Sequence, residues 1–269
     1  MSISLGNLEV IAGLPQVKFG CSIDNLIGDV TAEGELLRPT NYYDLNFAGV
    51  KTITATNALC RRFSTTYVRN VTFPDLEEVS GTYAFSSTFV ACPVISSVSF
   101  PKLEIISASS VFINCFQNIT NSFTLDLSKL IKITGTTALS AMCYQAPGLL
   151  SFDMSSLEEV RSNGLNGAFN GCTGLTTVTF PKLKNIAYTG ALIGCFTGCT
   201  NLTSISFGGL RSDSFGSFTN QFNTMLSNVT GCTVHFPSNL QSVIGNWTSV
   251  TAGFGGTNTT ILYDLTATT

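Results

Sequence analysis

The chain has 269 residues, of which 44% are hydrophobic and only 11% are charged, and its net charge at pH 7 is −3. The apolar fraction excludes a disordered chain, and the weak net charge gives no electrostatic basis for binding nucleic acid. A single histidine excludes any catalytic or zinc site that needs two imidazoles. In typical soluble domains about a quarter of the residues are charged, and this chain has less than half of that fraction. We therefore expect Ser, Thr, Asn and Gly to cover the surface.

The first 40 residues contain several glycines and a charged patch that runs from Glu33 to Arg38. The first ten residues lack a basic segment, and Glu9 interrupts their apolar run, so we expect no secretory signal. We interpret residues 1–40 as a cap or an attachment segment for the repeats that follow, because a stack of repeats needs cover for its first layer.

Residues 41–236 contain an internal repeat. The segment 175–186 (LTTVTFPKLKNI) has the same frame as the segment 95–106 (ISSVSFPKLEII). One apolar anchor recurs at intervals of 26, 27, 27, 27, 26, 27 and 29 residues. These anchors are Phe47, Phe73, Phe100, Leu127, Met154, Phe180, Phe207 and Phe236. Such regular spacing is typical of a protein built from stacked repeats.

Each repeat contains a Val-x-Phe pattern, whose alternation places both apolar side chains on one face of a short strand. One such coil cannot bury its own apolar side, whereas stacked coils share a continuous core and a parallel sheet. We therefore predict a mainly β fold: a leucine-rich-repeat solenoid of about 8 coils of 26–29 residues, with little helix. A globular sandwich of eight similar strands is the alternative.

The segment 168–186 (AFNGCTGLTTVTFPKLKNI) carries the frame most completely. It resembles the BspA-like class of leucine-rich repeats, and the resemblance covers about residues 45–236. The units here are longer than is usual in that class, so we expect extra loop residues opposite the sheet. The resemblance implies a binding or structural scaffold, as in bacterial and protist surface proteins and phage virion proteins, and not an active site.

The residue between the Val and Phe positions points outward, so these residues should form one ladder across the sheet. The ladder comprises Thr72, Ser99, Asp126, Asp153, Thr179, Ser206 and His235. We regard it as the candidate surface for a protein partner or a host glycan. The alternative is that its hydroxyls only hydrogen-bond to one another. Two adjacent aspartates do not make a calcium site, and His235 has no nearby Ser-Asp arrangement in the sequence. We therefore predict no catalytic residue, cofactor or metal.

The nine cysteines include no C-x-x-C pair, which favours small buried thiols in a reducing cytosol. Cys172 and Cys199 occupy equivalent positions in neighbouring repeats. A disulfide between them is the alternative in an oxidising setting.

Residues 237–269 depart from the frame, and we interpret them as a C-terminal cap or an interface with another subunit. Between Asp213 and Asp264, His235 is the only ionisable residue among Asp, Glu, Lys, Arg and His. The candidate interface residues are Trp247, Phe254 and Tyr263. Uncharged stretches elsewhere carry too many polar residues for a transmembrane helix, so we expect no membrane insertion.

These features favour a non-enzymatic structural protein of a phage virion, such as a capsid decoration, fibre or tail subunit, made in the bacterial cytoplasm. Its expected partners are other virion proteins, further copies of itself, or a host receptor. The alternative is a bacterial cell-surface adhesin, which the family resemblance alone would suggest.

Overall fold

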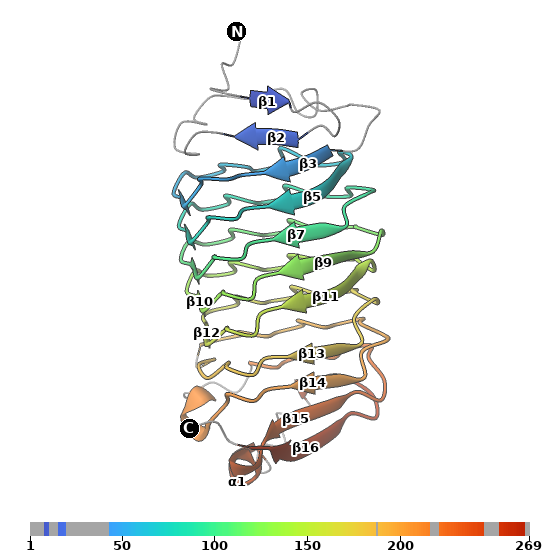
Figure 1. Ribbon diagram of the computed structural model, residues 1–269. Coiled ribbons are helices and arrows are strands. Elements are labelled where there is room, and N and C mark those ends of the chain that lie inside the picture. The colour runs from blue at the N-terminus through green and yellow to red at the C-terminus, as the bar shows by residue number, and fades with distance from the viewer. Residues whose placement is uncertain are drawn as a thin grey trace.

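The computed structural model describes residues 8–10, 16–19, 43–186, 188–215, 221–244 and 253–266. In these residues the chain winds into a stack of about eight coils, with parallel strands and almost no helix (Figure 1). The predicted parallel solenoid is confirmed, and the alternative of a globular sandwich is excluded. A coil has three sides: a strand that carries the Val-x-Phe pattern, a second side that holds a two-residue strand in five of the coils, and a run of turns.

The Val-x-Phe strands form two arrays along the stack, which are parallel throughout except that β1, at the N-terminal edge, runs antiparallel to β2. The first array has the order β1-β2-β3-β5-β7-β9-β11, and the second has the order β13-β14-β15-β16. The first comprises β1 (Leu8–Val10), β2 (Gln16–Phe19), β3 (Tyr43–Asn46), β5 (Val68–Thr72), β7 (Ser97–Ser99), β9 (Phe123–Asp126) and β11 (Leu149–Asp153). The second comprises β13 (Thr177–Thr179), β14 (Ser204–Ser206), β15 (Thr233–Pro237) and β16 (Thr260–Leu265). We call these two arrays together the strand side.

The second side of the coil is a sheet of two-residue strands, which follow the Val-x-Phe strands after a tight bend. Its order is β12-β10-β8-β6-β4, and every pair in it is parallel. These strands are β4 (Thr52–Ile53), β6 (Glu78–Val79), β8 (Ile105–Ile106), β10 (Lys132–Ile133) and β12 (Glu159–Val160). The second residue of each strand is buried, so this sheet contributes one aliphatic side chain per coil to the core.

The third side, which we call the turn side, is a run of regular hydrogen-bonded turns. It lies where we expected extra loop residues, opposite the sheet. Main-chain N–H groups there alternate between two acceptors. Phe85 and Ser87 donate to carbonyls of the next coil, whereas Ser86 and Thr88 donate to carbonyls three residues back. The turn side is thus bonded from coil to coil almost as regularly as a parallel sheet.

The ends of the stack are built from the remaining elements. At the N-terminal end, β1 pairs antiparallel with β2, and β2 pairs parallel with β3; the rest of the predicted segment 1–40 lies outside the described residues. Three short helical elements lie near the C-terminal end: η2 (Ser212–Phe215), η3 (Ser238–Leu240) and α1 (Gln241–Ile244). The sheet does not end at the boundary predicted after residue 236, because β16 adds a further strand parallel to β15.

The core is a continuous column of side chains that neighbouring coils share. All eight predicted anchors are at most 1% exposed. The rings of Phe47, Phe73 and Phe100 stack at centroid distances of 4.1 and 5.1 Å, and those of Phe180, Phe207 and Phe236 stack at 5.6 and 5.5 Å. Between these two stacks the anchors are Leu127 and Met154. Burial between layers is therefore what holds the fold together.

Candidate functional site

The structure places the predicted ladder on the strand side, in two parts. Thr72 pairs in register with Ser99, Ser99 with Asp126, and Asp126 with Asp153. In the second array Thr179 pairs with Ser206, and Ser206 with His235.

The break in the ladder falls between β11 and β13, which belong to different sheets. Here Phe152 replaces the Val, Leu or Ile of the other coils, and its ring is only partly buried. The ring stacks on that of Phe169 at 4.1 Å. The strand β11 also carries a register shift between Leu149 and Ser151. The larger side chain and the irregular strand therefore lie at the point where the ladder is interrupted between β11 and β13.

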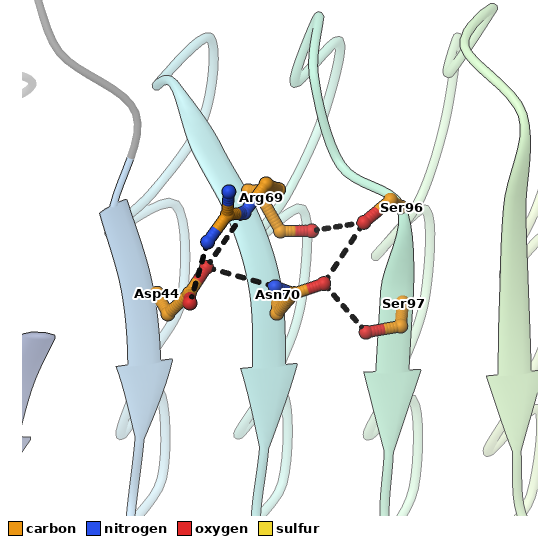
Figure 2. A network of polar contacts seen from close by, with 5 residues as sticks. All are labelled: Asp44, Arg69, Asn70, Ser96 and Ser97. Carbon is orange, nitrogen blue, oxygen red and sulfur yellow. Dashed lines mark hydrogen bonds and ion pairs between the residues drawn. The ribbon is translucent and has the colours of Figure 1, made fainter. Parts of the chain in front are cut away.

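At the N-terminal end of the first array, polar side chains bind one another across three strands (Figure 2). The Arg69 guanidinium donates to both carboxylate oxygens of Asp44, at 3.2 and 3.0 Å, and the Asn70 amide donates to the same carboxylate at 2.9 Å. The Asn70 carbonyl oxygen accepts from the hydroxyls of Ser96 and Ser97, both at 2.8 Å. The Asp44 carboxylate raises the pKa of Arg69. Sequence reasoning missed this network because it lies one row away from the predicted ladder.

The two adjacent aspartates are held by their own strands. Asp126 accepts from the Ser99 hydroxyl at 3.1 Å and from the Ser128 N–H at 2.9 Å. Asp153 accepts from the Ser155 N–H at 2.8 Å. These local bonds to the residue two positions ahead fix each carboxylate at the end of its strand. Lys102 does not reach these aspartates: it donates to Asp75 at 2.8 Å, and this hydrogen bond lowers the pKa of the Asp75 carboxyl.

His235 does have an acidic partner, which the sequence did not reveal. Its Nδ1 lies 2.9 Å from both carboxylate oxygens of Asp264, on the next strand. Ser206 lies beside His235 on the other flank, so the order of residue types is that of a catalytic triad. No hydrogen bond joins the Ser206 hydroxyl to the imidazole in this described part of the sheet, and the Phe207 N–H already donates to the His235 carbonyl. The neighbouring N–H is therefore not free to stabilise an oxyanion.

The predicted C-terminal interface residues have three different outcomes. Trp247 lies outside the described residues. Phe254 is wrong as an interface residue, because it is 1% exposed and packs on Phe222 with ring centroids 5.5 Å apart. Tyr263 is partly buried and stacks on Phe236 at 6.1 Å. Leu262, which sequence reasoning missed, is 40% exposed on the outer side of β16.

The cysteines line the interior of the turn side as thiols. Eight of the nine are described, and all eight are free, so the alternative disulfide between Cys172 and Cys199 is absent. The Cys172 thiol donates to the Cys143 carbonyl, and the Cys199 thiol donates to the Phe169 carbonyl, both at 3.1 Å. Burial raises the pKa of Cys199 to about 12, and it also raises the pKa of Cys172. These thiols are structural and are protected from reaction, since the thiolate is the reactive form.

Within the residues that the structure describes, no group of three or more His, Cys, Asp or Glu side chains is placed to bind a metal ion. Over the same ranges, no helix has the length and apolar character needed to cross a bilayer. A scan against protein-family models and a search of curated proteins both find no match for the chain. The likeness to BspA-like repeats therefore stays a resemblance.

Proposed function

We propose that this chain is a non-enzymatic structural or binding subunit of a phage virion, such as a capsid decoration, fibre or tail subunit. The observation that carries the proposal is the register of the strand side. Outward polar side chains repeat at the spacing of adjacent strands, about 4.8 Å. Such a rigid, extended surface suits a macromolecular partner better than a small molecule, which binds in a concave pocket.

The two arrays differ in how much of this surface is available. In the first, the side chains of Asp44, Arg69 and Asn70 are occupied with one another. In the second, Thr179 and Ser206 make no side-chain hydrogen bond among the described residues, so their hydroxyls remain for water or a partner. We therefore assign the partner-facing role chiefly to β13 and β14, since His235 on β15 is paired with Asp264.

The buried thiols support a protein that folds in a reducing compartment before it is assembled, because such a compartment keeps cysteines reduced. A bacterial surface adhesin is the second candidate, and the same regular polar surface favours it. The two candidates differ in where the protein is found.

The test is to locate the protein with an antibody in purified phage particles and on intact uninfected cells. We expect the wild type to co-purify with particles. The variant Thr179→Lys should lose this co-purification, and the control Lys182→Glu, in the bend that follows β13, should keep it. We expect Thr179→Lys to weaken binding to particles by about tenfold or more, which corresponds to about 1.4 kcal/mol. Detection only on uninfected cells would support the adhesin instead, and detection in neither place would refute both.

A further inference from the structure

The turn side carries no charged residue over most of its length. Its successive segments are residues 81–95, 108–122, 135–148, 162–175, 189–202, 221–232 and 253–259, and none contains Asp, Glu, Lys, Arg or His. We call the outer surface of these seven segments the neutral face. The preceding segment does contain Arg61 and Arg62, so the neutral face begins at the second coil.

The charges are instead gathered on the other two sides of the coil. Ion pairs join neighbouring coils there, as between Lys102 and Asp75 or between Lys184 and Glu158, both at 2.8 Å. The uncharged stretches of the sequence therefore come together in space because each coil places its run of turns on the same side. A protein face without charge is unusual, since roughly a quarter of the residues of soluble proteins are charged.

The main chain of the neutral face is already hydrogen-bonded. Ser87 donates to Ile113 in the next coil, and Ala141 donates to Asn166 in the same way. The residues between these donors bond within their own coil, as Tyr144 does to Ala141. A partner can cover this face without leaving backbone donors unsatisfied, so the cost of removing water from it is low. Tyr83 and Tyr144, 44% and 37% exposed, supply the side-chain type that is enriched in interfaces.

The chemistry of the face restricts what can bind there. A charged partner would lose its hydration without meeting an opposite charge, which is costly. The partner surface must therefore be neutral and similarly extended, and the neutral face of a second copy meets both conditions. Seven coils span about 29 Å at the spacing of adjacent strands. A standard interface of about 800 Å² per partner is about 28 Å on a side, so the length is sufficient.

We propose that two copies of this chain associate through their neutral faces to form a symmetric dimer. A two-fold axis brings each surface onto the same surface of its partner, and no like charges meet across it. This inference is independent of the proposed function, because it concerns a different side of the coil and any assembly could use the resulting dimer.

The test compares near-isosteric changes that add only a charge. Gln145→Glu and Asn118→Asp, at exposed positions in adjacent coils, place carboxylates on the neutral face. The matched control is Gln241→Glu, an equally small change at an exposed position in α1. The full chain and these variants are compared by light scattering and sedimentation equilibrium, and circular dichroism and thermal unfolding verify that each variant is folded.

The wild type is expected to give twice the chain mass of 28.6 kDa. The double variant should raise the dimer dissociation constant by about tenfold or more, while Gln241→Glu leaves it unchanged. Because no ion pair contributes, raising NaCl from about 0.1 to about 1 M should not weaken the dimer. A wild type that stays monomeric at about 100 µM, or a dimer that weakens equally in the control or not at all in the double variant, would overturn the proposal.

Discussion

The strand side and the turn side both bond one coil to the next, and both bury stacked phenylalanine rings, but their backbones differ. On the strand side, extended residues alternate inward and outward, and stacked rings such as Phe73 and Phe100 fill the interior. On the turn side, residues with positive φ recur every four positions, as at Tyr83, Ser87 and Ala91. Thiols are part of the interior there, as at Cys172 and Cys199.

This difference shows that one repeat can support two kinds of ladder. The strand side derives its stability from large apolar side chains, since a buried Phe removes much apolar surface from water. The turn side also buries Phe rings, as at Phe85 and Phe112, and it carries backbone strain at its positive-φ residues, which it offsets with hydrogen bonds between coils. We therefore expect different conditions to lower the stability of the two sides.

The largest effect is expected from alkaline pH, and it acts on the turn side. Seven described thiols, all of them on the turn side, have a pKa above the ordinary 9.0, and burial is the main cause. A pKa that is higher in the folded state gives stability that is complete below pH 9 and is lost as the pH rises toward the folded value. Above pH 9 the thiols of the unfolded chain ionise while the buried thiols stay protonated, so the free energy of unfolding should fall by on the order of several kcal/mol between pH 7 and pH 10.

Urea unfolding followed by circular dichroism from pH 7 to pH 10 measures this loss. The variant Cys172→Ala/Cys199→Ala is the control, because it removes two titrating thiols. Over the same pH interval it should lose less free energy of unfolding than the wild type, by roughly the share of two thiols in seven, whatever its stability at pH 7. An equal pH dependence for variant and wild type would show that these thiols do not control alkaline stability.

The next effect concerns the strand side, where Phe100 lies between the rings of Phe73 and Phe112. Phe100→Ala should lower the free energy of unfolding by about 3–5 kcal/mol, because it leaves a cavity between two coils. Phe100→Leu should cost less than about 1.5 kcal/mol, since Leu127 fills the same position in the next coil. Urea unfolding at pH 7 compares the two variants. If Leu were as costly as Ala, ring stacking and not filled volume would control this side.

The strand side could be predicted from the sequence because its signal is local and repeated. The anchors from Phe47 to Phe236 follow a nearly constant interval, and alternation assigns each neighbour to a face. The last strand, whose sequence is strand-like, was assigned to the C-terminal cap and not to the repeat. Tyr263 does follow Phe236 by 27 residues, but Ile261 and Tyr263 replace the usual Val and Phe. The acidic partner of His235, which lies on that strand, was therefore missed.

The turn side could not be predicted in the same way. Positive φ is normally inferred from Gly or Asn, yet Tyr83, Ala141 and Gln145 adopt it here. Their conformation is imposed by hydrogen bonds to the next coil, so it depends on residues about 25 positions away in the sequence. For the same reason, the uncharged segments could be counted in the sequence but not assigned to one surface.

The smallest effect tests the strain on the turn side directly, with two residues that are neighbours in the stack. Ala141 and Gly167 both have positive φ, both donate to the next coil, and both accept from the residue three positions ahead. A Cβ on Gly167 would meet no atom within 4 Å, so Gly167→Ala tests the backbone alone. This change should destabilise the protein by about 1 kcal/mol. The reverse change, Ala141→Gly, should stabilise it by less than that, because glycine also gains entropy in the unfolded chain. Thermal and urea unfolding measure the change in the free energy of unfolding for each variant. If both variants change it in the same direction, the backbone conformation is not the source of the strain.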